Sequence, residues 1–309
     1  MALPVHASIG ERVWHYCYLG ICCLIFLFLI APILIIIPLS FNAEPYFTFT
    51  HKMMSLDPEG YSLRWYDQIL TFGMSNPDTA REAAWWNDAW NNATWLHAMK
   101  NSALISIFAT VFATTLGTLA ALGLSRPEMP FRRAIMALLI SPMIVPLIIT
   151  ATGLFFFYSA TGLAHTFIGI VMAHAMLGIP FVIITVTATL VGFDHSMTRA
   201  AASLGASPIT TFRKISLPLI LPGVISGALF AFATSFDEVV VVLFVASYDQ
   251  RTIPLQMWNG IREQISPTIL SVATILVVFS ISLLTVIELL RRRSERSEER
   301  RVGKECRSR

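Results

Sequence analysis

Two adjacent carboxylates, Asp237 and Glu238, interrupt the apolar stretch 219–246. An ionised side chain at the centre of a hydrocarbon layer costs about 3 kcal/mol unless it faces a polar cavity or a partner group. Neighbouring positions on a helix point about 100° apart, so we expect only one of the two to face such a cavity directly, and we place Asp237 first. Two interpretations fit the pattern: an acidic site that favours a cationic ligand, or a structural carboxylate paired with a neighbouring helix.

Aromatic and imidazole side chains also lie in apolar stretches. Tyr158 closes the aromatic run 155–158, which is typical of the belt at a membrane interface. An aromatic wall can also hold an ammonium group by cation–π attraction, so Tyr158 is a third candidate for such a site. His165 and His174 lie nine residues apart in the stretch 163–191, on opposite faces of one expected helix. We interpret both as hydrogen-bonded core residues rather than ligands.

The segment 192–218 has the pattern of two short helices joined by a tight turn. Residues 197–204 are rich in alanine and precede Gly205, which suits a left-handed helix C-cap. Ser207 and Pro208 then supply an N-cap and a first helical position, and Pro218 is expected to begin the next helix. The small side chains form a surface that another protein can approach closely, although an ordinary interfacial loop has the same pattern.

No sequence motif indicates catalysis. The chain contains no G-x-x-x-x-G-K-[ST] loop, no H-E-x-x-H and no G-x-S-x-G. Its four cysteines, Cys17, Cys22, Cys23 and Cys306, lack the spacing of metal ligands or redox pairs. We therefore predict that the chain is not an enzyme and holds no metal or cofactor of its own.

The elements that position these residues are expected to be membrane-spanning helices. The 309 residues are 55% hydrophobic and 13% charged, with a mean hydropathy of +0.66, whereas soluble domains carry about a quarter charged residues. This composition excludes a soluble enzyme, a disordered protein and a nucleic-acid-binding protein. It predicts an all-α integral membrane protein.

Six stretches have roughly the 20 apolar residues that a spanning helix needs. Pro142 and Pro146 are expected to break the third stretch, and Pro180 to kink the fourth. Lys and Arg gather in the short segments on one side, which predicts that both termini face the cytoplasm. The six stretches are 16–39, 103–124, 135–158, 163–191, 219–246 and 268–290.

The spans define the organisation of the chain. Residues 1–15 form a cytoplasmic N-terminus, and 16–293 form the six-span domain. Within that domain, 40–102 is a long outer loop and 192–218 is a cytoplasmic loop. The charged tail, 294–309, is expected to be disordered or foreign to the native protein.

The outer loop contains a tryptophan-rich segment, 78–97. Thr79 and Glu82 have the spacing of a capping box, which predicts a helix start. Trp86 and Trp90 then recur at helical spacing. We interpret the segment as a helix at the membrane interface, with a docking face for an outer partner as the alternative.

The loop 192–218 also resembles a known family. Its alanines, the run Leu204-Gly205-Ala206-Ser207 and the later Leu217-Pro218 are similar to the EAA loop of ABC-importer permeases, the coupling helix that docks on the cytoplasmic ATPase. Ala200 stands where the family pattern begins with Glu. The resemblance assigns ATPase coupling to Ala200, Ala201, Ala202, Leu204, Gly205, Ala206, Ser207, Leu217 and Pro218.

Further likeness, over about residues 60–290, is to the polyamine-type permeases, and most to the second permease of putrescine/spermidine importers. It rests on 62–66, Asn101-Ser102, 235–240, 252–255 and Ser266-Pro267. The resemblance implies a type I ABC-importer permease fold in the bacterial inner membrane, crossing it several times. It also places Asp237 at an acidic position of the substrate pathway, with Glu238 and Tyr158 as further candidates.

The resemblance implies partners as well. They are a homologous second permease, a cytoplasmic ABC ATPase dimer that binds ATP and Mg²⁺, and a periplasmic substrate-binding protein. The chain is also expected to contact membrane lipid, and nucleic acid is not expected among its partners. This chain would form half of the pathway for a small cation such as putrescine or spermidine. An opine, an aminophosphonate or a zwitterionic osmolyte as substrate, and a stand-alone secondary transporter, are the alternatives.

Overall fold

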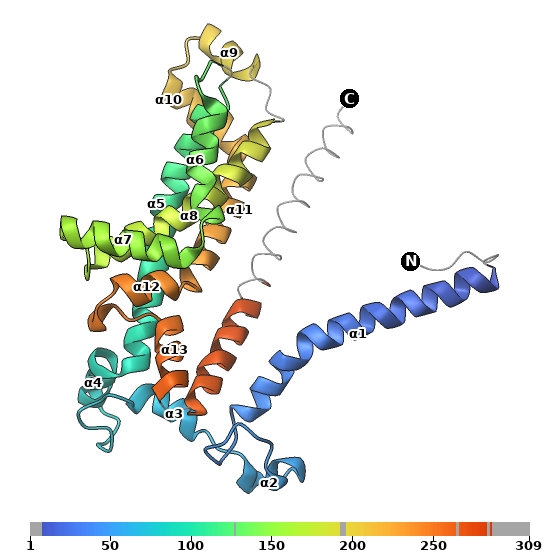
Figure 1. Ribbon diagram of the computed structural model, residues 1–309, viewed down its shortest axis with the longest axis vertical. Coiled ribbons are helices and arrows are strands. Elements are labelled where there is room, and N and C mark those ends of the chain that lie inside the picture. Colours follow the sequence, from blue (N-terminus) through green and yellow to red (C-terminus); the bar gives the residue numbers. More distant parts are fainter. Residues whose placement is uncertain (1–7, 127, 192–195, 264–265, 283–284, 286–309) are drawn as a thin grey trace, which may run out of the picture. The chain divides into compact units, whose positions relative to one another are not determined.

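The structure is a computed structural model that describes residues 8–126, 128–191, 196–263, 266–282 and 285 (Figure 1). Within these ranges the regular secondary structure is helical, apart from one isolated antiparallel bridge between Asn42 and Tyr61. The chain divides into two compact units, Met1–Thr71 with Gly260–Arg309, and Phe72–Asn259.

The first unit begins with a long apolar helix, α1 (Ile9–Leu39). Ser8 and Glu11 cap it reciprocally, because each side chain accepts the backbone N–H of the other residue, at 3.3 Å and 2.8 Å. The helix therefore starts before the predicted span 16–39, inside the segment expected to be a separate N-terminus.

Polar contacts around Ser40 hold the rest of the first unit together. The Ser40 hydroxyl lies 2.7 Å from the hydroxyl of Tyr66 on α3 (Arg64–Thr71). The Ser40 carbonyl accepts a hydrogen bond from the Ser271 hydroxyl at 3.2 Å, on the helix Thr268–Ser282. Between α1 and α3 the chain forms two short helices, α2 (His51–Met54) and η1 (Pro58–Gly60).

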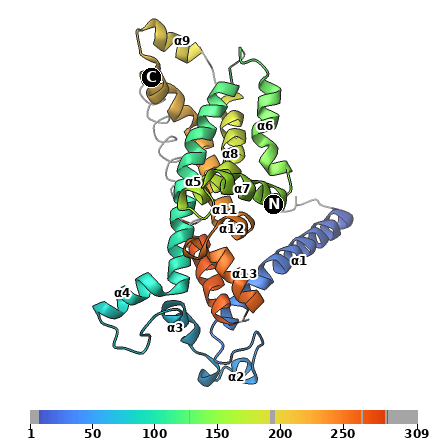
Figure 2. The ribbon, with the colours of Figure 1, turned by 60° about the vertical axis from the view of Figure 1, so that its left-hand side comes forward.

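The second unit is built on three helices that pack side by side, α5 (Thr94–Leu124), α8 (Phe167–Val191) and α11 (Leu217–Phe236) (Figure 2). Gly178 of α8 lies where all three meet. A Cβ atom at this position would lie 2.9 Å from the Ala231 Cβ and 3.1 Å from the Ala113 Cβ. Small residues thus allow close helix packing, as is common in membrane proteins.

The third predicted span is broken at Pro146, as predicted, but the break predicted at Pro142 is wrong, because this proline lies inside a helix. Helices α6 (Arg132–Ile144) and α7 (Leu147–Thr161) meet at an angle of 102°, and Figure 1 shows α7 crossing the direction of α5 and α8. Pro146 lies at the break, where its missing N–H leaves no helical hydrogen bond to lose. Pro142 lies inside α6, and Pro180, of the fourth predicted span, lies inside α8.

The prediction of one continuous span over 219–246 is wrong. Helix α11 ends at Phe236, and a separate short helix, α12 (Val240–Val245), follows after three non-helical residues. The chain then forms η3 (Tyr248–Gln250) and α13 (Ile253–Glu263).

Among the described residues, four helices are long and apolar enough to cross a membrane, or five spans if α6 and α7 count as one. The helix Thr268–Ser282 is shorter. Most of 283–290 and the whole tail 294–309 lie outside the described residues, so the sixth span and the nature of the tail stay predictions.

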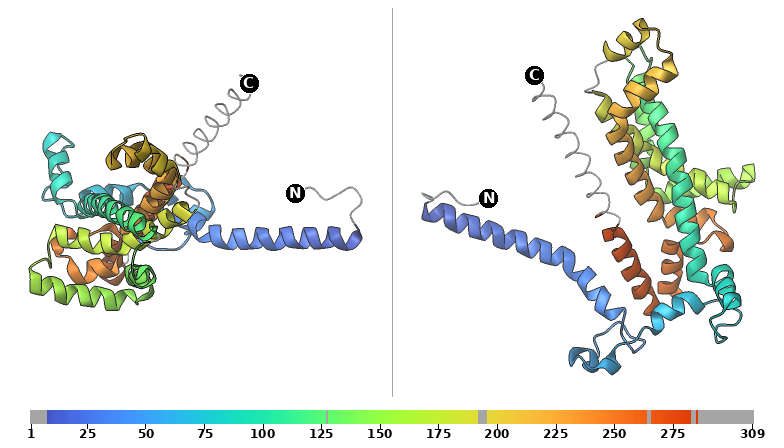
Figure 3. Two further views of the ribbon diagram at one scale, coloured as in Figure 1. Left: turned by 90° about the horizontal axis from the view of Figure 1, so that it is seen from above. Right: turned by 180° about the vertical axis from the view of Figure 1, so that it is seen from behind.

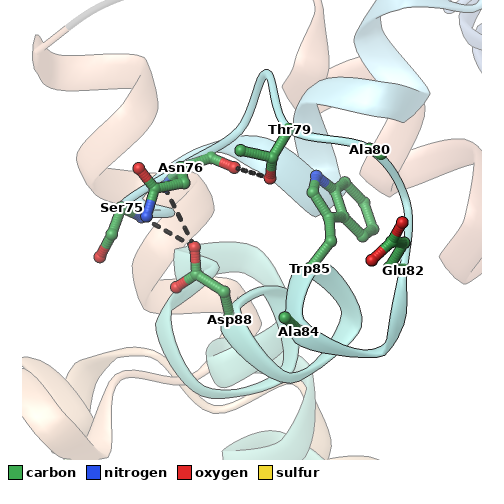
Figure 4. Close-up of a pocket in the computed structure, with 8 residues that line it drawn as sticks. All are labelled: Ser75, Asn76, Thr79, Ala80, Glu82, Ala84, Trp85 and Asp88. Carbon is green, nitrogen blue, oxygen red and sulfur yellow. Dashed lines mark hydrogen bonds between the residues drawn. The ribbon is translucent and has the colours of Figure 1, made fainter.

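The tryptophan-rich segment folds into α4 (Ala83–Asn92) and a loop held by Asp88 (Figure 4). The Asp88 Oδ2 atom accepts the N–H groups of Ser75 at 3.2 Å and Asn76 at 3.1 Å. The indole of Trp85 donates to the Pro77 carbonyl at 3.0 Å. A pocket of about 570 Å³ lies between this loop and the helix.

The predicted capping box is wrong. The helix begins at Ala83, with Glu82 as an N-cap whose side chain makes no capping hydrogen bond. The Thr79 hydroxyl instead donates to the Asn76 carbonyl at 3.0 Å. The Thr79 side chain is therefore engaged in a local turn and does not cap the helix.

Candidate functional site

The loop after α8 folds as its small residues predict. Helix α9 (Ser196–Ser203) is terminated two residues after its end by Gly205, which has a φ of +79°, a conformation that glycine adopts without a Cβ penalty. The N–H groups of Gly205 and Ala206 donate to the carbonyls of Ala202 and Ala201, both at 3.0 Å. These paired bonds form a Schellman motif, and the predicted C-cap at Gly205 is confirmed.

A second helix restarts immediately after this turn. The Ser207 hydroxyl accepts the Thr210 N–H at 3.3 Å, with Pro208 at the first position of α10 (Pro208–Thr211). The predicted N-cap is therefore confirmed. Residues 192–195, the first part of the predicted loop, lie outside the described residues.

The surface of this turn is exposed and partly apolar. Leu204 is 88% exposed and Ile209 is 72% exposed, whereas Ala201 is a buried residue of α9. Exposed apolar side chains that gather at one turn are typical of a protein contact. The other predicted coupling residues are exposed (Ala200, Ala202, Gly205, Ser207 and Pro218) or half-buried (Ala206 and Leu217).

A single helical rod of 29 residues runs from Pro208 to Phe236 (Figure 3). It contains α10, one π-helical turn, η2 (Phe212–Ser216), and α11. Pro218, predicted to begin a new helix, is instead an early residue of α11 within this rod. The exposed turn and the acidic pair are therefore the two ends of one helical element.

The acidic pair lies at the break between α11 and α12. Asp237 is exposed and forms the C-cap of α11, where its N–H donates to the Ala233 carbonyl at 3.1 Å. Glu238 is buried, and its Oε1 accepts the N–H of Val241 at 2.9 Å, in the first turn of α12. The two carboxylates thus have different surroundings because both lie in the break between α11 and α12, rather than because they face different sides of one helix.

A buried hydrogen bond fixes the end of α11. His174 of α8 lies 2.8 Å from the hydroxyl of Ser235, measured from the imidazole Nδ1, and both side chains are buried. His174 is thus a hydrogen-bonded core residue, as predicted. His165 does not lie on the same helix: it precedes α8, with a φ of +61°. Among the described residues, no three His, Cys, Asp or Glu side chains gather as metal ligands.

Tyr158 lies in the core rather than at an open surface. Its side chain is 5% exposed and packs with Ile105, Ile170 and Val242. The interpretation of its ring as part of an interfacial belt or an open aromatic wall does not fit this burial. Its neighbours Phe156 and Phe157 are the exposed members of the run.

Two segments that lie far apart in the sequence are joined in the structure. The Asn101 side-chain amide donates to the carbonyls of Asp249 at 2.8 Å and Arg251 at 2.9 Å. Next to it, the Ser102 hydroxyl accepts the N–H of Ile253 at 2.8 Å. The start of α5 therefore positions the loop that follows α12, a role that sequence reasoning missed.

Residues 113–298 match the family described as binding-protein-dependent transport system inner membrane component. The chain belongs to this family. The match contains α8, the exposed turn and α11, so the elements of the candidate site are part of what the family shares.

Members of this permease family with similar sequences are known. The spermidine/putrescine transport system permease protein PotC of Haemophilus influenzae is 31% identical over 270 residues, which cover 87% of this chain and 94% of that protein. PotC of Escherichia coli (strain K12) is 30% identical over 268 residues, covering 87% and 91%. The putrescine transport system permease protein PotI of Escherichia coli (strain K12) is 29% identical over 258 residues, covering 81% and 82%.

A solved structure has the same fold. It is a bacterial ABC transporter involved in the import of the acidic polysaccharide alginate, with a TM-score of 0.68 to this chain. The similarity covers 93% of this chain and 99% of that one, at 15% sequence identity. The chain is therefore an all-helical transport permease, a multi-pass protein of the inner membrane.

Proposed function

We propose that this permease is one of two homologous membrane subunits of an ATP-driven importer for a small cation such as putrescine or spermidine. A cytoplasmic ATPase dimer, which binds ATP and Mg²⁺, docks on the turn around Gly205. A periplasmic binding protein delivers the substrate. The observation that carries the proposal is the exposed Schellman turn at one end of the rod that reaches Asp237.

The rod gives this coupling a physical route. A closing ATPase dimer would displace the turn, and a helix without an internal break transmits that displacement along its axis. Its far end is the break at Asp237, where non-helical backbone at membrane depth is tolerated if it lines a cavity. Discontinuous helices of this kind form substrate sites in other transporters.

The exposed carboxylate of Asp237 supports a cationic substrate. A fixed negative charge lowers the barrier for an ammonium group in a low-dielectric pathway. It offers no such advantage to an opine, an aminophosphonate or an osmolyte, each of which also carries an anionic group. The spermidine/putrescine and putrescine permeases among the relatives support the same substrate class.

Substitution of Leu204 tests the coupling proposal. Leu204 is 88% exposed, so Leu204→Asp leaves the packed core intact while placing a charge on the docking surface. We expect the variant to insert normally but to lose co-purification of the ATPase subunit and substrate uptake, while the Leu204→Met control keeps both. Undiminished uptake by Leu204→Asp would contradict docking at this turn and would favour the alternative of a stand-alone secondary transporter.

The substrate is tested by ATP hydrolysis of the reconstituted complex with its binding protein. Stimulation by spermidine or putrescine is the expected result. If neither amine changes the rate of ATP hydrolysis but an opine, an aminophosphonate or an osmolyte raises it, the chain would still belong to an importer, and the proposed substrate would be wrong.

A further inference from the structure

A second contact surface lies at the end of the second unit opposite to the exposed turn, around α4 and the start of α5 (Figure 2). We propose that five residues of this surface, here called the interface belt, lie in the lipid headgroup layer, where the two cations among them bind lipid phosphate groups. The belt consists of Trp86, Trp90, Lys100, Tyr248 and Arg251.

The exposed face of α4 is aromatic and uncharged. Trp86 is 51% exposed and Trp90 is 57% exposed, one helical turn apart, whereas Trp85 is buried on the opposite face. Beside the two exposed indoles on the helix surface lies Asn87, whose Oδ1 accepts the side-chain N–H of Asn91 at 2.8 Å. A face of indoles and paired amides suits the boundary between water and hydrocarbon, where tryptophan is enriched.

Lys100 of α5 fixes the height of this face along the spanning helix. Its ammonium nitrogen lies 4.6 Å from the centre of the Trp90 ring and donates a hydrogen bond to the Trp90 carbonyl. The contact links the end of α4 to the first turns of α5. The level of Lys100 on α5 therefore determines the level of Trp90.

The level of Lys100 follows from the sequence of α5. The apolar run of this helix begins at Ala103, so at a rise of 1.5 Å per residue the Lys100 backbone lies about 4.5 Å beyond the hydrocarbon edge. The headgroup layer on each side of a bilayer is about 5–8 Å thick. Lys100 and the ring packed on it therefore fall within that layer.

An exposed apolar stripe continues from Lys100 down α5. Leu104, Ile107 and Val111 follow it by four, seven and eleven residues, the spacing of one helix face, and they are 47%, 51% and 57% exposed. If this stripe contacts the lipid acyl chains, Lys100, at its outer end, contacts the lipid headgroups. This continuity favours a lipid surface over a docked protein.

A second aromatic and cationic pair lies at the same level of α5. The guanidinium of Arg251 stacks 4.1 Å from the centre of the Tyr248 ring, and Tyr248 is 66% exposed. Asn101, the residue after Lys100, donates to the carbonyl of Asp249, which lies between the two members of this pair in the sequence, and to the carbonyl of Arg251 itself. Two cations at one level, each beside an exposed ring, match a layer of anionic phosphates bordering hydrocarbon.

The test places a fluorescent label at the belt. In a full-length chain whose four cysteines are replaced by serine, Trp90→Cys carries an environment-sensitive dye in vesicles of phosphatidylethanolamine and phosphatidylglycerol. The vesicles contain a lipid with a nitroxide quencher on its headgroup or, separately, in its acyl chain. Val111→Cys on the apolar stripe and Leu204→Cys on the exposed turn serve as the deep and the aqueous control.

We expect the label at Trp90→Cys to be quenched most by the headgroup nitroxide, that at Val111→Cys by the acyl-chain nitroxide, and that at Leu204→Cys by neither. Water-like emission at Trp90→Cys without quenching would overturn the proposal. So would shielding that appears only when the binding protein is added, because the surface would then contact a protein.

Variants of Lys100 supply a second measurement. With Trp90 retained and the label placed instead at Asn87→Cys on the same helix, Lys100→Gln removes the cation and its contact with the Trp90 ring, so headgroup quenching at that label should fall, while Lys100→Arg should retain it. Equal quenching in both variants would show that this contact does not set the position of α4. The inference depends on α5 spanning the membrane with its exposed stripe toward lipid, so it stands or falls separately from the proposed ATPase and substrate.

Discussion

At the scale of single residues, Asp237 and Glu238 carry the same charge and have different tasks. Glu238 is buried, and its carboxylate satisfies a backbone N–H that α12 would otherwise leave without a partner. Asp237 is exposed at the C-cap of α11, where its backbone rather than its side chain serves the helix. The side chain of Asp237 is therefore available to a substrate without loss of structure.

Substitutions of the pair should have separable effects. We expect Asp237→Asn to leave thermal stability unchanged and to raise the substrate concentration needed for half-maximal uptake, because the attraction for a cation is lost. Uptake curves over a full concentration series are the measurement. Identical curves for Asp237→Asn and the unmodified chain would make this carboxylate merely structural.

Glu238 provides the matched comparison. Glu238→Ala removes the oxygen that caps α12 and should destabilise the fold by about 1 kcal/mol, as loss of a helix cap does. Glu238→Gln retains an oxygen acceptor for the Val241 N–H and should retain most of the stability. Thermal unfolding in detergent measures both, and equal loss in the two variants would contradict a capping role.

At the scale of elements, the close packing of α5, α8 and α11 depends on Gly178. Gly178→Val adds atoms within 2.9 Å of Ala231 and 3.1 Å of Ala113, and such overpacking typically costs about 1–3 kcal/mol. Gly153→Val in α7 is the control, since no atom lies within 4 Å of a Cβ there. Similar melting temperatures for the two variants would argue against this packing.

The loop before α4 should respond to pH. A hydrogen bond from the Asn92 side chain, together with the N–H groups of Asn76 and Ser75, lowers the pKa of the Asp88 carboxyl below its ordinary value. The folded pKa is the lower one, so this contribution is complete above the ordinary pKa and is lost as pH falls through the lowered value. We expect the Asn76 amide to lose hydrogen-exchange protection in that acidic range.

Asp88→Asn distinguishes the charge from the fold of the loop. The variant keeps an acceptor oxygen but cannot ionise, so its Asn76 amide should be less protected at neutral pH and should not respond to acid. A pH response that persists in this variant would point to another titrating group.

The elements also show how far the sequence predicts the site. The caps at Gly205 and Ser207 were predictable because each depends on residues within five positions. The end of α11 at Phe236 was not, because the apolar stretch continues and Glu238 caps a new helix only once its carboxylate is buried. The bond between His174 and Ser235 joins residues 61 positions apart, which no local pattern reports, and the burial of Tyr158 likewise depends on tertiary packing.

At the scale of the whole molecule, the excess of Lys and Arg in the short loops predicts which side each loop faces. Labelling of intact cells with a membrane-impermeant maleimide tests it in the cysteine-free chain. We expect Ala80→Cys, in the exposed loop before α4, to react from outside, and Leu204→Cys to react only after permeabilisation. The reverse pattern would invert the topology and place the exposed turn out of reach of a cytoplasmic ATPase.

The π-helical turn Phe212–Ser216 has a consequence for how the chain meets its surroundings. A π-turn accommodates one additional residue within a helix, so it changes the angular phase of everything that precedes it. If the same residues formed regular α-helix, the turn around Gly205 would lie about 100° further round the axis of α11, whereas deleting one residue together with the π-turn would leave its azimuth unchanged. The π-turn thus determines the direction around the axis of α11 in which Leu204 and Ile209 point. It does so without changing how far these residues lie from the helix bundle.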